Sequence, residues 1–287
     1  VVGGIKRIAQ VTEKVVPFMA CAYILGALVI FIVNIGKIGE VFTSIFSFAF
    51  GFRALGGAAI GLAVKNAVTW GFKRGVFSNE AGLGSSVMVH SASNVVEPVK
   101  QGMWGIFEVF ADTIVVCTLT AFSILSTGLI DLHTGEMLSA NEQTALVSEA
   151  FGTVFNFGSV NVGGIFIAIA VLLFAFSTVL GWSYYGTKAW EFLFGTKATI
   201  IYKVVFVVFI VFGATMNLDL AWDISDTFNG LMALPNLIGV LVLSGTVIKI
   251  TNNYVARIFK GSKEKPMISA FEDIQKEQEI KLAQEQN

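Results

Sequence analysis

Six apolar segments, each about long enough to cross a bilayer, constrain this chain more than any other feature of its sequence. A membrane-spanning helix needs roughly twenty apolar residues. The segments are residues 15–35, 66–92, 102–129, 162–190, 200–216 and 228–250. Charged residues make up only 14% of the 287-residue chain, against about 25% in soluble domains. The ten-residue alternation of a membrane barrel is missing. We therefore expect an all-α integral membrane protein, with the lipid bilayer as its surroundings.

The charges between these segments predict an orientation. Basic residues gather in alternate connections, at Lys6, Arg7, Lys14, Lys100, Lys188, Lys197, Lys203, Lys249, Arg257, Lys260 and Lys263. The acidic residues of the other connections are Asp131, Glu136, Glu142, Glu149, Asp219, Asp223 and Asp226. Basic connections lie on the cytoplasmic side. We expect residues 1–250 to form a multi-pass transmembrane region of the plasma (inner) membrane, and residues 251–287 a solvated, polar cytoplasmic helical tail. The net charge of −1 argues against nucleic acid as a partner.

The second segment contains a polar stretch, residues 73–86, which reads KRGVFSNEAGLGSS. Charges at membrane depth are costly and mark functional candidates. Irregular backbone survives there only inside protein or beside a water-filled cavity. Counted from Lys65, the helical rise places Phe77 about 16 Å deep, near the midplane. We expect a helix broken next to Phe77; the alternative is an interfacial loop between two short apolar segments.

A break at this depth would expose peptide groups to a ligand. Helix termini carry partial charges, so both charges of a zwitterion would find partners there. The candidate substrate-binding residues of the break are Phe77, Ser78, Asn79, Glu80 and Gly82. In the alternative reading Arg74 and Glu80 simply neutralise each other, which leaves Gly75, Gly82 and Gly84 unexplained.

The fourth segment holds a second polar set, within residues 173–186, which read LFAFSTVLGWSYYG. The hydroxyls of Ser177 and Thr178, with the carbonyl of Phe174, form a hard oxygen set suited to a monovalent cation. The alternative is that each hydroxyl donates to a preceding carbonyl of its own helix. We assign Trp182 to the substrate site, and the tyrosines that follow it to the membrane interface.

The third segment carries two acids four residues apart, Glu108 and Asp112, which α-helical spacing places on one face. We expect a buried charge network in which one of them pairs with Arg74. Pro235 and Asn236 predict a kink in the last segment rather than a ligand site. Motifs of soluble enzymes and of metal sites are missing, so we expect no catalytic residues. His90 and His133 are read as surface or packed histidines.

The connections are expected to carry helices of their own. Residues 40–50 predict an amphipathic helix lying on the membrane. Residues 141–151 predict a short helix capped by Ser139 or Asn141.

Three of these motifs resemble one family. Residues 74–85, RGVFSNEAGLGS, look like the hallmark of the alanine or glycine:cation symporters, also called sodium:alanine symporters. Residues 174–186 resemble the second signature of that family, and residues 230–236, GLMALPN, resemble a third. The resemblance runs from residue 3 to about residue 244.

The resemblance implies a fold of five-plus-five inverted repeats, in which the first and sixth core helices are broken. The chain would hold core helices five to ten, with the missing N-terminal helices of the same protein as partners. The break at Phe77 would face alanine or glycine. Phe174, Ser177 and Thr178 match the position where the eighth helix of this fold coordinates Na⁺.

The expected function is sodium-coupled symport of a small neutral amino acid by alternating access, with Na⁺ as coupling ion and no other cofactor. A cation channel and a non-transporting membrane scaffold are the alternatives. Alanine against glycine, D- against L-substrates, Na⁺ against protons, and the oligomeric state are left open.

Overall fold

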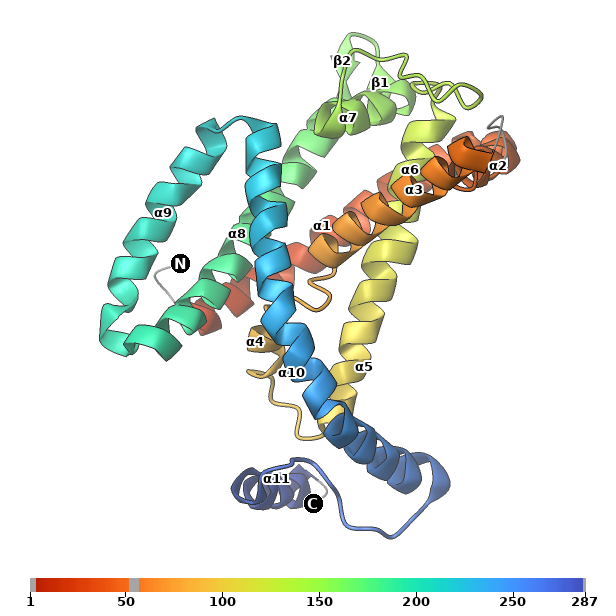
Figure 1. The fold of residues 1–287 in the computed structure, drawn as a ribbon. Coiled ribbons are helices and arrows are strands. Elements are labelled where there is room, and N and C mark those ends of the chain that lie inside the picture. Colours follow the sequence, from red (N-terminus) through yellow and green to blue (C-terminus); the bar gives the residue numbers. More distant parts are fainter. Residues whose placement is uncertain (1–3, 52–56, 286–287) are drawn as a thin grey trace. The chain divides into compact units, whose positions relative to one another are not determined.

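The computed structural model describes residues 4–51 and 57–285, which are mainly helical (Figure 1). The helices are α1 (Gly4–Val33), α2 (Ile38–Ala49), α3 (Gly57–Ser78), α4 (Val87–His90), α5 (Pro98–Val109), α6 (Cys117–Ser126), α7 (Gln143–Val154), α8 (Val162–Phe194), α9 (Thr199–Thr215), α10 (Leu218–Lys260) and α11 (Glu272–Glu285). A π-helical stretch, Phe110–Val116, joins α5 to α6. Two short strands, β1 (Asn156–Phe157) and β2 (Val160–Asn161), pair as an antiparallel hairpin. The predicted all-α class is confirmed.

Five of the described helical stretches are long and apolar enough to cross a membrane. They are Gln10–Val33, Pro98–Ser126, Val162–Phe194, Thr196–Thr215 and Leu218–Lys260. The sixth predicted segment, residues 66–92, is not among them, and that it crosses the membrane stays a prediction. That segment is divided between α3 and α4 by eight non-helical residues, 79–86, here called the bent segment.

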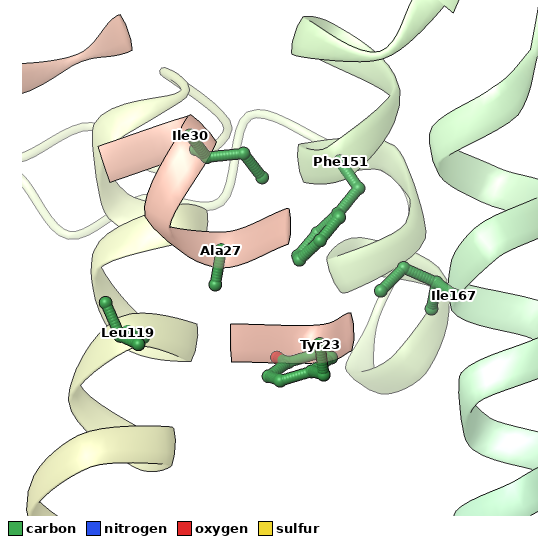
Figure 2. Close-up of a cluster of buried hydrophobic side chains, with 6 residues drawn as sticks. All are labelled: Tyr23, Ala27, Ile30, Leu119, Phe151 and Ile167. Atoms are coloured by element: carbon green, nitrogen blue, oxygen red, sulfur yellow. The ribbon is translucent and has the colours of Figure 1, made fainter. Parts of the chain in front are cut away.

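The chain forms two compact units. The first consists of Val1–Arg74 and Asp112–Thr215, and the second of Gly75–Ala111 and Met216–Asn287. The core of the first unit is a cluster of six buried side chains (Figure 2), Tyr23, Ala27 and Ile30 of α1, Leu119 of α6, Phe151 of α7 and Ile167 of α8. The three α1 residues lie on one face because their spacing follows the helical period. A hydrogen bond of 2.6 Å joins the hydroxyls of Tyr23 and Thr120 at the edge of this core.

Helix α8 starts where it crosses α7 closely. The Asn161 side chain caps α8 by accepting the Gly164 N–H at 2.7 Å. A Cβ atom on Gly163 would collide with the Phe151 carbonyl, so only glycine fits there.

Helix α7 confirms the predicted short helix, but the predicted cap is wrong. Glu142 stands at the N-cap position and its side chain makes no capping bond. Ser139 and Asn141 instead donate hydrogen bonds to the carboxylate of Glu149, one helical turn or more into α7. These two bonds, that of Ser139 first, hold the pKa of Glu149 below its usual value. The predicted amphipathic helix at residues 40–50 is confirmed as α2.

The second unit packs the C-terminal segment, residues 261–285, against the loop before α5. Val96 from that loop, Ile268 and Leu282 form a small buried cluster. The Arg257 guanidinium lies 2.9 Å from both carboxylate oxygens of Glu97, and the side chains are only 9% and 4% exposed. The expected tail is therefore helical over α11 but not wholly solvated, because one edge of it is buried.

Candidate functional site

The bent segment begins where α3 ends, at Ser78. The Ala81 N–H donates to the Val76 carbonyl at 3.2 Å, which closes the last turn. Glu80 adopts a left-handed conformation, with φ of 49°, at a place where helix ends usually have glycine. The buried Ser85 hydroxyl donates to the Glu80 carboxylate at 2.7 Å and so holds the side chain of this strained residue. The predicted break next to Phe77 is confirmed.

Two glycines give the bent segment its shape. Gly82 and Gly84 both have φ of 81°, which L-residues with side chains rarely adopt. A Cβ atom on Gly82 would lie 3.1 Å from the Leu237 side chain of α10. Gly75 differs, because it lies inside α3 and a Cβ atom there would meet no described atom within 4 Å. Only two of the three singled-out glycines are therefore explained by backbone geometry.

Helix α10 lies against this segment within the second unit. The Asn236 side-chain amide donates to the Gly82 carbonyl at 3.0 Å. The Phe77 and Trp222 rings meet edge to face, 5.2 Å between centroids. Neither Trp222 nor Asn236 is among the predicted site residues. The signal for Asn236 was the third signature motif, which we interpreted as a kink. Helix α10 runs through Pro235, and the kink itself stays a prediction.

The predicted residues divide between the two units. Phe77, Ser78, Asn79, Glu80 and Gly82 lie together in the second unit, at the end of α3 and in the bent segment. Ser78 is exposed at the surface of the described chain, and the others are partly buried.

The residues predicted to bind sodium lie on α8, in the first unit, together with Trp182. The Ser177 hydroxyl donates to the Phe174 carbonyl at 2.9 Å, which is the back-bonding geometry of the alternative interpretation. The pair still offers oxygen lone pairs, because a hydroxyl and a carbonyl each accept two bonds. Thr178 follows on α8 and is exposed. The sodium and substrate assignments stay predictions.

The structure shows the neighbours of two members of the predicted charge network, Glu108 and Arg74. Glu108 lies 3.4 Å from His90 Nε2, and the Gln101 amide nitrogen is 2.7 Å from His90 Nδ1, so His90 is a packed histidine. Arg74 lies over the Trp70 ring, 5.4 Å from its centroid. Asp112 falls in the π-helical stretch, so the α-helical spacing assumed between the two acids holds only up to Val109. The described residues contain no group of three His, Cys, Asp or Glu side chains that could hold a metal ion.

Comparison with known proteins gives a consistent result. A family model described as the sodium:alanine symporter family matches residues 1–269. The sodium/alanine symporter AgcS of Methanococcus maripaludis is 46% identical over 260 residues, which cover 88% of this chain and 53% of that protein. The probable sodium/glutamine symporter GlnT of Bacillus subtilis is 38% identical, with 88% and 50% covered. The amino-acid carrier protein AlsT of Bacillus subtilis is 36% identical, with 90% and 52% covered. The chain spans about half the length of the curated relatives it matches.

Proposed function

Because the chain belongs to the sodium:alanine symporter family, we propose that the intact protein couples Na⁺ entry to uptake of alanine or glycine across the plasma membrane. The family consists of transporters rather than enzymes, and the chain is a multi-pass membrane protein. The observation that carries the proposal is the break that follows α3. There the backbone leaves the helix at Glu80, Gly82 and Gly84. Alternating access in an inverted-repeat fold, with a cytoplasmic C-terminus, is part of the same proposal.

The bent segment suits a zwitterion for an electrostatic reason. The C-terminal end of α3 carries a partial negative charge that attracts an ammonium group. Backbone turned out of a helix presents further peptide dipoles within a few ångströms. We assign the ligand contacts to Phe77, Ser78, Asn79 and Glu80, with Gly82 shaping the turn, and a supporting role to Trp182. Na⁺ binding at α8 would favour the state that accepts the amino acid, which couples the two.

The test of this function uses the intact protein in proteoliposomes. We expect saturable uptake of labelled alanine that is driven by an inward Na⁺ gradient and stops when an ionophore collapses it. A channel would instead give a current proportional to voltage, without saturation by alanine. A membrane scaffold would give neither uptake nor current. Either of these two results would refute the proposed function.

Removal of the α8 hydroxyls tests the sodium assignment. The double variant Ser177→Ala/Thr178→Val should raise the Na⁺ concentration for half-maximal uptake about tenfold or more, because two oxygen ligands are lost. Ser183→Ala is the matched control, since the Ser183 hydroxyl also donates three residues back on α8, to Leu180 at 2.7 Å. Unchanged Na⁺ dependence in the double variant would remove Ser177 and Thr178 from the site.

A double-mutant cycle tests the charge network. We expect Arg74→Gln and Asp112→Asn to be coupled by about 0.5–3 kcal/mol in the free energy of unfolding of the intact protein. The same cycle with Glu108→Gln tests the other acid. Strictly additive losses in both cycles would show that Arg74 pairs with neither.

A further inference from the structure

Asn236 is an α10 residue whose side chain donates a hydrogen bond to the bent segment. The same side chain leaves no room for a Cβ atom at Gly84. We propose that Asn236 is a positioning residue, which fixes the peptide groups of the bent segment in the orientation that receives the amino acid. This inference rests on the proposed function, because it takes the bent segment as the substrate site. It assigns no direct contact between Asn236 and the substrate.

The first observation is the hydrogen bond across 154 residues of sequence, from Asn236 Nδ2 to the Gly82 carbonyl, at 3.0 Å. The bond fixes the direction of the peptide that follows Gly82, since a peptide unit is planar. It also occupies one lone pair of the Gly82 carbonyl. Gly82, predicted from the sequence as a substrate-binding residue, would then act through the shape of the turn.

The second observation is how closely the backbone passes the same side chain. A Cβ atom on Gly84 would lie 2.7 Å from Asn236 Oδ1 and 2.9 Å from Asn236 Cγ. These distances are shorter than van der Waals contact, and the atoms approached include the stem of the Asn236 side chain. Asn236 therefore bonds to the turn at Gly82 and leaves no room for a side chain at position 84.

The third observation is a local tie within the turn. The Ser85 hydroxyl holds the Glu80 carboxylate at 2.7 Å, five residues apart. A local tie of this kind sets the internal shape of the turn. The bond from Asn236 adds a tie between the turn and α10, a helix of 43 residues.

The experiment compares three variants of the intact protein. Asn236→Leu removes the donor at similar size. Asn236→Asp keeps the shape but turns a second acceptor toward the Gly82 carbonyl. Ser244→Ala is the matched control, because the Ser244 hydroxyl bonds only to the Leu241 carbonyl of its own helix among the described residues. Two quantities are measured, hydrogen exchange of residues 79–86 without substrate, and alanine affinity at saturating Na⁺.

We expect faster exchange of residues 79–86 and about tenfold weaker alanine binding in both Asn236 variants, with Ser244→Ala unchanged. Faster exchange with unchanged affinity would overturn the inference, because Asn236 would then be structural only. Weaker binding with unchanged exchange would also overturn it, because Asn236 would then contact the substrate itself. Absence of both alanine and glycine binding in the unmutated protein would refute the proposed function instead; hydrogen exchange alone would then decide whether Asn236 holds the turn.

Discussion

Gly84→Ala is expected to lower Na⁺-driven alanine uptake by the intact protein about a hundredfold. A left-handed conformation costs a residue with a side chain about 1–2 kcal/mol, and Gly84 has φ of 81°. The added methyl group would also meet Asn236 Oδ1 at 2.7 Å, and such crowding costs about 1–3 kcal/mol. The turn can relieve both only by moving, which displaces the peptide groups of the candidate site. Initial uptake rates in proteoliposomes measure the effect.

The matched control is Gly75→Ala, in the last two turns of α3. A Cβ atom there would meet no described atom within 4 Å, and alanine favours helix over glycine by about 1 kcal/mol. We expect uptake close to that of the unmutated protein. Equal losses in the two variants would contradict the structural account of the turn, because the two glycines differ in conformation and surroundings.

Glu97→Gln is expected to lower the free energy of unfolding by about 3 kcal/mol, because it leaves the charge of Arg257 buried without its counter-ion. The two side chains are 4% and 9% exposed and meet at 2.9 Å. A loss of this size corresponds to a fall of a few degrees in the melting temperature of a large protein. Thermal unfolding of the intact protein in detergent measures it.

The C-terminal segment supplies the control within the same unit. Glu277 pairs with Lys281 at 2.8 Å along α11, but both side chains are more than half exposed. Such surface pairs contribute about 0–1 kcal/mol. Glu277→Gln should therefore leave the melting temperature nearly unchanged. Equal shifts in Glu97→Gln and Glu277→Gln would mean that burial of the Arg257 pair has no energetic consequence.

The sequence predicts the features of this fold that depend on local pattern. Apolar length located five candidate spans, and amphipathic spacing located α2. The break was predictable because charged residues and glycines interrupt an apolar run, and backbone at Glu80, Gly82 and Gly84 does leave the helix. The same break divides the sixth predicted span, and that this span crosses the membrane stays a prediction.

Contacts between distant parts of the chain could not be predicted from the local sequence pattern. The bond from Asn236 to Gly82 crosses 154 residues, and its motif looked like a proline kink. Ile268 and Leu282 were read as part of a solvated tail, because α11 is polar overall and only its packing against Val96 shows the buried edge. Ser139 and Asn141 were chosen as caps on residue type, but Glu149 competes for their hydrogen bonds.

The most direct test of the whole account is an experimental structure of the intact protein with Na⁺ and alanine bound. We predict density for the amino acid within hydrogen-bond distance of the main chain at residues 77–80, with α3 broken after Ser78 inside the bilayer. Alanine bound elsewhere, an unbroken helix through Glu80, or a bent segment lying at the lipid headgroups would contradict it.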